Sequence, residues 1–193
     1  QMAPFHQFRE IAQTKSTADY SPIPYMSMLS NSALWFLYGI STGNTTLILS
    51  YLTAVSSAAV CTAVFAKHNT KPENSAVMKK YGILSGSLLG ALTYGAFCTD
   101  LGSMIGMDAA GMFGTVGVAT AVMAYVSPLS VMKSVIQNKS ASALPFGLCS
   151  AMALNAATWF CYGWFITDDI YLWIPGLLGV TAGLTQLTLL AIY

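Results

Sequence analysis

Two short segments of the chain carry the same aromatic and amide side chains at the same spacing. Each segment has an Asn, a Trp four residues later, and a Tyr-Gly pair that begins three residues after the Trp. The members are Asn31, Trp35, Tyr38 and Gly39 in the first segment and Asn155, Trp159, Tyr162 and Gly163 in the second. An Asn four residues before a Trp lies on the same face of a helix. An indole ring offers an apolar face and one N–H donor, and a buried amide needs hydrogen-bond partners, so this chemistry is that of binding.

The sequence holds no group of residues with the spacing of a catalytic or metal centre. His6 and His68 stand apart, and the four cysteines are scattered in apolar segments without a Cys-x-x-Cys pair. We find no nucleophile–base pair and no phosphate-binding glycine loop. We therefore expect no enzyme, no metal site and no cofactor.

The chain carries few charges for its length. Its 193 residues include eight Lys and Arg and seven Asp and Glu, so that 8% are charged, while 55% are hydrophobic. A soluble domain has about 25% charged residues. This composition excludes a soluble domain, a disordered chain and a disulfide scaffold. The net charge of +1 predicts no nucleic-acid partner. An integral membrane protein in contact with the lipid bilayer remains.

Six apolar stretches are long enough to cross a bilayer, for which a helix needs about 20 residues. They cover approximately residues 22–41, 45–66, 83–98, 109–135, 143–166 and 170–193. A shorter apolar piece, residues 2–12, begins the chain. The runs are too long for barrel strands and do not alternate polar with apolar residues, so we expect an all-α protein.

The charges are distributed unevenly over the connections between these stretches. The basic residues all lie at odd-numbered connections: Arg9, Lys15, Lys67, Lys71, Lys79, Lys80, Lys133 and Lys139. The even-numbered connections hold four acids and no Lys or Arg: Asp100, Asp108, Asp168 and Asp169. The positive-inside rule places the odd connections on the cytoplasmic side. The pattern predicts seven spans, with the N-terminus outside and the C-terminus on the cytoplasmic side.

A shift of 124 residues aligns the chain with itself. Pro4 then falls on Pro128, and Trp35 falls on Trp159; identical residues occupy 11 of the 36 positions 4–39. The repeat is a three-helix unit, and one helix, about residues 83–98, lies between its two copies. We expect a first repeat over 1–66, a cytoplasmic loop with the linker helix over 67–108, and a second repeat over 109–193. Three spans end on the opposite side of the membrane from where they began, and the linker helix returns the chain to the starting side. The two three-helix bundles are therefore parallel, in a 3+1+3 arrangement.

Several motifs together resemble the SWEET family of sugar transporters, also called MtN3/saliva and related to the PQ-loop proteins. They are Lys15-Ser16, Ser21-Pro-Ile-Pro24-Tyr, Trp35-Phe-Leu-Tyr38-Gly39, Tyr125-Val-Ser-Pro128, Lys139-Ser140, Leu144-Pro145-Phe146 and Trp159-Phe-Cys-Tyr162-Gly163. The resemblance covers nearly the whole chain. It implies a transporter whose substrate site lies between parallel repeats near the midplane of the membrane.

The resemblance also implies a set of substrate-binding positions. Trp35 and Trp159 match the residues that pack on the sugar, where an indole face meets the apolar face of a pyranose. Asn31 and Asn155 lie on the same helical faces and either bind the ligand or bridge helices. The family places an Asn on the third helix of each repeat. This chain has Gly176 there, and the shift of 124 residues gives Leu52 in the first repeat. Neither side chain can hydrogen-bond a sugar, which weighs against ordinary hexose binding.

Further positions match the moving parts of the family. A proline in each of four helices is expected to permit a kink, so that each bundle can rock. These hinge residues are Pro4, Pro24, Pro128 and Pro145. Tyr38 and Tyr162 match the outer gate, where a Tyr hydroxyl meets a carboxylate of Asp168 or Asp169. One extra residue in this part of the second repeat leaves the choice between the two acids open.

The first helix is expected to be incomplete. In the second repeat about 19 residues of the helix precede Pro128, whereas only three residues precede the equivalent Pro4. At the rise of an α-helix, this difference corresponds to about 24 Å of helix length. We expect a SWEET-like facilitative uniporter that moves a small neutral solute, a mono- or disaccharide, by alternating access. The alternative is a SWEET-like fold retained as a structural subunit of a larger membrane complex, favoured by the missing Asn pair and the short first helix. A homo-oligomer and membership of such a complex both stay open.

Overall fold

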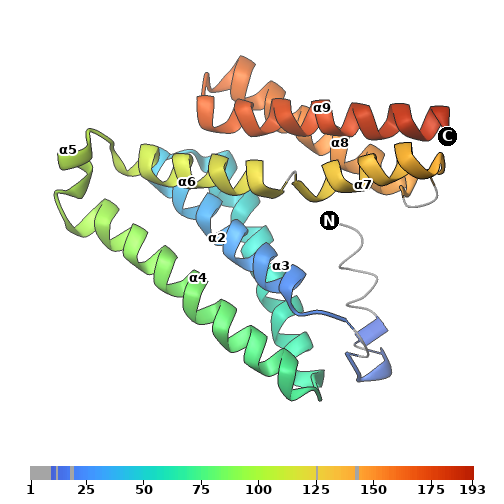
Figure 1. The fold of residues 1–193 in the computed structure, drawn as a ribbon. Helices are drawn as coiled ribbons and strands as arrows, with labels where there is room; N and C mark the ends of the chain where they lie inside the picture. The colour runs from blue at the N-terminus through green and yellow to red at the C-terminus, as the bar shows by residue number, and fades with distance from the viewer. Residues whose placement is uncertain (1–9, 12, 18–19, 125, 142–143) are drawn as a thin grey trace. The chain divides into compact units, whose positions relative to one another are not determined.

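The computed structural model of the protein describes residues 10–11, 13–17, 20–124, 126–141 and 144–193. The regular structure in these residues is entirely helical, which confirms the expected all-α class (Figure 1). The elements are α2 (Ile23–Thr42), α3 (Thr45–His68), α4 (Pro72–Cys98), α5 (Leu101–Ile105), α6 (Ala109–Ala124), α7 (Val126–Asn138), α8 (Phe146–Cys161), the π-helix η1 (Tyr162–Ile166) and α9 (Ile170–Ile192).

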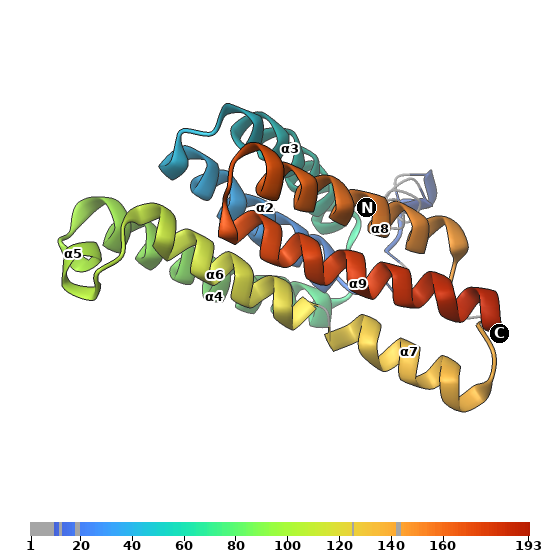
Figure 2. The same ribbon diagram turned by 90° about the horizontal axis from the view of Figure 1, so that it is seen from above.

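The chain divides into two compact units, Gln1–Gly114 and Thr115–Tyr193, with the division inside α6. In the first unit α2 packs along α3 and also contacts α4, where Ser27 Oγ and Tyr81 OH are hydrogen-bonded at 3.0 Å. In the second unit α8 and η1 pack along α9, and α7 lies beside the C-terminal half of α9 (Figure 2). The pair α2–α3 and the pair α8–α9 are therefore the corresponding helix pairs of the repeat.

Three of the described helices, α3, α4 and α9, are long and apolar enough to cross a membrane, and α6 is a shorter apolar helix. The linker helix is longer than expected, because α4 begins at Pro72 rather than near residue 83. Lys79 and Lys80, expected in a loop, lie inside α4. Its 27 residues span about 40 Å against about 30 Å of hydrocarbon, so the basic first turns can extend beyond the apolar layer.

The stretch expected as one span over 109–135 is helical on both sides of residue 125, in α6 and α7. They end at Ala124 and begin at Val126, and Tyr125 lies outside the described residues. Pro128 has no N–H and cannot donate to the carbonyl of Ala124, four residues earlier. The proline therefore weakens a continuous helix at this point.

The repeat is visible in the backbone at two lysines. Lys15 and Lys139, which the shift of 124 residues superposes, have φ values of 53° and 48°. Each follows a helical stretch, and Lys15 N–H donates to the carbonyl of Ile11 at 2.9 Å. A left-handed residue at a helix end is usually Gly, but a positive charge there interacts favourably with the last carbonyls.

The first connection is fixed to its surroundings by side-chain hydrogen bonds. Tyr20 OH donates to Glu10 Oε2 at 2.7 Å, and Asn74 Nδ2 at the start of α4 donates to the carbonyl of Tyr20 at 3.4 Å. The hydrogen bond to Glu10 raises the pKa of the Tyr20 phenol above its usual value, because it stabilises the neutral form. The connection is thereby tied to both its preceding helix and α4.

Candidate functional site

The Trp and Tyr of the repeated motif make the same contact in both units. The rings of Trp35 and Tyr38 are 5.5 Å apart and 85° from parallel, and those of Trp159 and Tyr162 are 6.0 Å apart and 86° from parallel. Edge-to-face pairs of this kind are a favoured arrangement of aromatic rings. Each repeat thus holds its Trp with its own Tyr, on the second helix of the repeat.

The two tryptophans differ in how far the third helix covers them. Tyr51 of α3 stacks on Trp35, with ring centroids 6.1 Å apart and an interplanar angle of 19°. Trp35 is 6% exposed, whereas Trp159 is partly exposed. The first repeat therefore uses an aromatic ring to cover its Trp, and the second repeat leaves part of its Trp accessible within its own unit.

The connection between the two helices of each pair is one residue longer in the second repeat than in the first. In the first unit Asn44 N–H donates to the carbonyl of Gly39 at 3.0 Å, and in the second Asp169 N–H donates to the carbonyl of Gly163 at 2.8 Å. Gly39 and Gly163 differ by 124 positions, but Asn44 and Asp169 differ by 125. The π-helix η1 contains the extra residue, as π-turns within helices often do at functional sites.

Close contacts between the helices confirm the changed register. A Cβ atom on Gly39 would meet Leu47 Cβ at 3.0 Å, and one on Gly163 would meet Leu172 Cβ at 2.9 Å. Leu47 and Leu172 again differ by 125. In this register Gly176 pairs with Tyr51, one residue before the expected Leu52, and a role for Leu52 in binding stays a prediction. Leu52 is 47% exposed on α3.

Gly176 is required by the packing of α8 against α9. A Cβ atom there would lie 2.6 Å from the backbone N of Phe160 and 2.7 Å from its Cα. Real Cβ atoms do not approach backbone so closely, and small residues permit such contacts between membrane helices. The family's Asn has no room at this position in the observed backbone.

Asn31 and Asn155 lie one turn before their tryptophans, and both are exposed within their units. A bridge between helices, one of the two roles expected, stays a prediction. A role in binding a ligand or a group from outside the unit is compatible with these positions.

The gate residues are placed differently in the two repeats. Tyr38 is buried at 2% exposure, and Tyr162 opens η1. Asp169 caps α9, because its Oδ1 accepts from Tyr171 N–H at 2.9 Å. Asp168 is exposed and has a φ of 49°. The extra residue in η1 thus leaves Asp168 as the exposed acid next to the N-cap residue.

Two of the prolines expected as hinges, Pro24 and Pro145, lie at helix starts rather than in helix interiors. Pro24 is in the first turn of α2, Pro145 is the N-cap of α8, and Pro128 is the third residue of α7. A first-turn proline removes no intrahelical hydrogen bond, so the expected interior kink is absent at Pro24 and Pro145. Pro4 lies outside the described residues. Pro175, which had no assigned role, is the proline inside α9.

The described residues offer little for chemistry other than binding. Among them, no group of three or more His, Cys, Asp or Glu could hold a metal ion. The repeated tryptophans and the exposed amides are the groups that can contact a solute. Helices that can cross a bilayer, together with an internal repeat of a binding motif, define a multi-pass membrane protein of the transporter type.

Comparison with known families identifies the class. The family described as "Sugar efflux transporter for intercellular exchange", MtN3/saliva, matches residues 2–73 and 111–193. The chain belongs to this family, known as SWEET, which confirms the resemblance. The family is one of transporters and not of enzymes, and with the apolar helices it makes the chain an integral membrane protein.

Individual relatives agree. The bidirectional sugar transporter SWEET13 of Oryza sativa subsp. japonica is 31% identical over 196 residues, which cover 100% of this chain and 64% of that protein. The bidirectional sugar transporter SWEET7 of Arabidopsis thaliana is 32% identical, and the match covers 100% of this chain and 74% of that protein. The chain thus spans about 64% of the length of the first relative. A solved eukaryotic SWEET transporter has the same fold, with a TM-score of 0.84 at 23% identity, over 98% of this chain and 87% of that one.

Proposed function

We propose that the protein is a facilitative transporter of a small neutral solute, a mono- or disaccharide. The repeated Trp–Tyr pair carries this proposal, since the same edge-to-face geometry occurs in both repeats of a SWEET-type chain. The bidirectional sugar transporters among its relatives supply the class of solute. Trp35, Trp159, Asn31 and Asn155 are the proposed substrate contacts.

Trp159 is the principal surface for the solute in this proposal. Tyr51 already stacks on Trp35, whereas the corresponding Gly176 has no ring to place beside Trp159. An apolar sugar face can therefore pack on Trp159 without displacing a ring of the third helix. Trp35 and Tyr51 together form a rigid wall, and the Tyr51 phenol occupies the family's Asn position in the first repeat.

Alternating access would follow from two parallel three-helix bundles joined by α4, over 1–66, 67–108 and 109–193. Pro4, Pro24, Pro128 and Pro145 are the proposed hinge positions, because flexibility at a joint moves a helix without breaking it. Tyr38, Tyr162 and Asp168 or Asp169 form the proposed gate. Asp168 is favoured, since Asp169 is engaged as a helix cap.

The orientation proposed from the charges places Lys133 and Lys139 at the cytoplasmic side and Asp168 and Asp169 at the outer side. Within the second unit one helix, α8, separates the two lysines from the two aspartates along the chain. If α8 crosses the membrane once, the two pairs lie on opposite sides, as the positive-inside rule requires. The N-terminus is then outside and the C-terminus on the cytoplasmic side.

Uniport is proposed because the chain has no ATP-binding loop and no acid inside an apolar span. Liposomes that hold the full chain should equilibrate labelled hexose down its gradient without ATP. An imposed pH gradient should leave the final internal concentration equal to the external one. Accumulation above the external concentration would contradict uniport.

The second candidate function, a structural subunit of a membrane complex, is favoured by the covered Trp35 and by the missing room for Asn at position 176. Native gel electrophoresis of gently solubilised membranes separates the two candidates. A transporter migrates as a monomer or small homo-oligomer. Quantitative migration with a large complex, together with no hexose flux in liposomes, would favour the subunit.

A further inference from the structure

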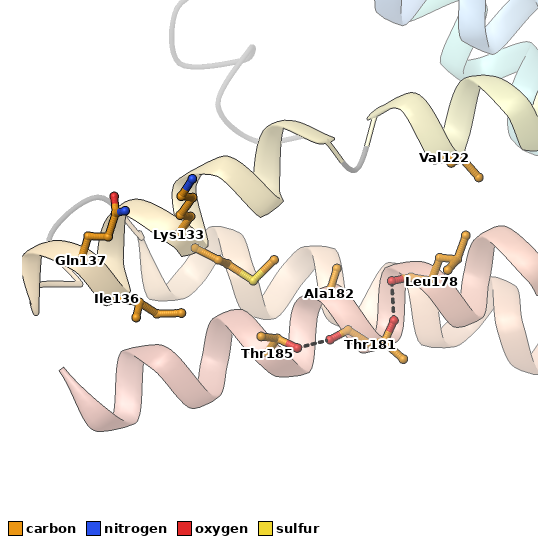
Figure 3. Close-up of a pocket in the computed structure, with 9 residues that line it drawn as sticks. Val122, Lys133, Ile136, Gln137, Leu178, Thr181, Ala182 and Thr185 are labelled. Atoms are coloured by element: carbon orange, nitrogen blue, oxygen red, sulfur yellow. Dashed lines mark hydrogen bonds between the residues drawn. The ribbon is translucent and has the colours of Figure 1, made fainter.

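A groove of about 600 Å³ lies between α7 and α9 in the second unit (Figure 3). Met132 and Ile136 of α7 form one wall, Leu178 and Ala182 of α9 form the other, and Val122 of α6 lies at one end. Its volume is within the range of small-ligand sites, about 300–1,000 Å³. It opens on a different face of α9 from the glycines that pack against α8.

The α9 wall of the groove offers no hydroxyl donor. Thr181 Oγ1 donates to the carbonyl of Leu178 at 2.9 Å, and Thr185 Oγ1 donates to the carbonyl of Thr181 at 2.8 Å (Figure 3). Both hydroxyl hydrogens are therefore used inside the helix. A sugar hydroxyl that needs a donor finds none on this wall, which is unfavourable. The wall suits hydrocarbon.

Lys133 stands at the rim of this apolar groove, with Gln137 one turn further along α7 (Figure 3). The facing elements carry no acid near it. α6 and α7 contain no Asp or Glu, and the acids of the second unit are Asp168 and Asp169 at the start of α9. Asp169 precedes Leu178 by nine residues, about 13 Å along a helix. The groove thus has a positive rim over an apolar interior.

We propose that the groove binds one anionic phospholipid, with an acyl chain between α7 and α9 and the headgroup phosphate on Lys133 Nζ. A long Lys side chain reaches from apolar surface to the headgroup level, and basic sites between membrane helices are suited to anionic lipids. The Gln137 amide supplies a second donor to the phosphate. The bound chain fills the space between α7 and α9 and holds the two helices at a fixed separation.

Native mass spectrometry of the full chain, extracted with either phosphatidylglycerol or phosphatidylcholine present, tests the proposal. Wild type should retain phosphatidylglycerol, and Lys133→Gln should reduce retention about fivefold or more, the effect of one lost basic contact. Lys139→Gln is the matched control: it removes the same charge from the same connection, but Lys139 does not line the groove. Ala182→Phe, which fills the groove, should lose both the phosphatidylglycerol and any phosphatidylcholine.

Three results would overturn the proposal. The first is equal retention of phosphatidylglycerol by wild type and Lys133→Gln. The second is an equal loss in Lys139→Gln, which would reflect general surface charge. The third is displacement of the lipid by inorganic phosphate alone, which would show a phosphate site without an acyl chain. Unchanged near-ultraviolet circular dichroism of each variant establishes that the helices are still packed.

Discussion

The ring of Tyr51 lies against the ring of Trp35, 6.1 Å between centroids and 19° from parallel. Its counterpart in the second repeat is Gly176, which cannot make this contact. The two repeats therefore share a Trp–Tyr pair on the second helix and differ in what the third helix places beside it. This difference makes the proposed solute site one-sided, with Trp159 as its accessible ring.

Replacing Tyr51 by Asn should uncover Trp35 and restore an amide at the family's position. We expect a lower apparent KM for hexose uptake in liposomes, and a stability loss of about 0.5–1.5 kcal/mol from the lost ring pair. Tyr51→Phe keeps the stack and is the control. If Tyr51→Asn and Tyr51→Phe show the same apparent KM, the amide position does not limit hexose binding in this chain.

Adding a methyl group at Gly176 should destabilise the protein, because the new Cβ meets the backbone of Phe160 at 2.6 Å. We expect Gly176→Ala to cost about 1–3 kcal/mol, measured as a lower melting temperature in detergent. Gly90 of α4 has nothing within 4 Å of its ideal Cβ position, so Gly90→Ala is the matched control. It should leave stability unchanged or raise it by up to about 1 kcal/mol. An equal melting temperature for both variants would contradict the close approach of α8 and α9.

The left-handed backbone at Lys139 predicts a preference for Gly over Ala at this position. Both substitutions remove the charge, but only Ala keeps a Cβ that crowds the backbone at a φ of 48°. Lys139→Gly should therefore be more stable than Lys139→Ala by about 1 kcal/mol in thermal unfolding. The reverse order would show that residue 139 is not left-handed in the folded protein.

The proposed orientation places all seven lysines on one side of the membrane. A membrane-impermeant amine reagent applied to intact cells should label none of them, and permeabilisation should expose them to the reagent. Peptide mass spectrometry assigns the labelled positions, for which Lys67 and Lys139 represent the two repeats. Labelling of one of these residues but not the other in intact cells would rule out parallel repeats.

Much of the fold follows from the sequence for physical reasons. Apolar length predicts the helices, and the identity of Trp35 with Trp159 and of Tyr38 with Tyr162 predicts equivalent ring geometry. Lys15 and Lys139, equivalent by the same shift, share a left-handed backbone. Features that depend only on neighbouring residues of one helix can be predicted well from a sequence pattern.

The register of the third helix could not be taken from the constant shift. One extra residue in the second repeat is contained in η1, so that the offset changes from 124 to 125 between Gly163 and Asp169. Counting from this insertion would have given Tyr51 instead of Leu52. The close approach of Gly176 to Phe160 is a tertiary contact between two helices, and no local pattern reports it.

The central claim, that solute binds on Trp159, is tested most directly by uptake of labelled hexose into liposomes that contain single Trp variants. Trp159→Ala should lower uptake about tenfold or more, because the apolar sugar face loses its packing surface. Trp164→Ala, which removes the 49% exposed indole of η1, should transport like wild type. Wild-type uptake by Trp159→Ala, at equal protein incorporation, would contradict the account.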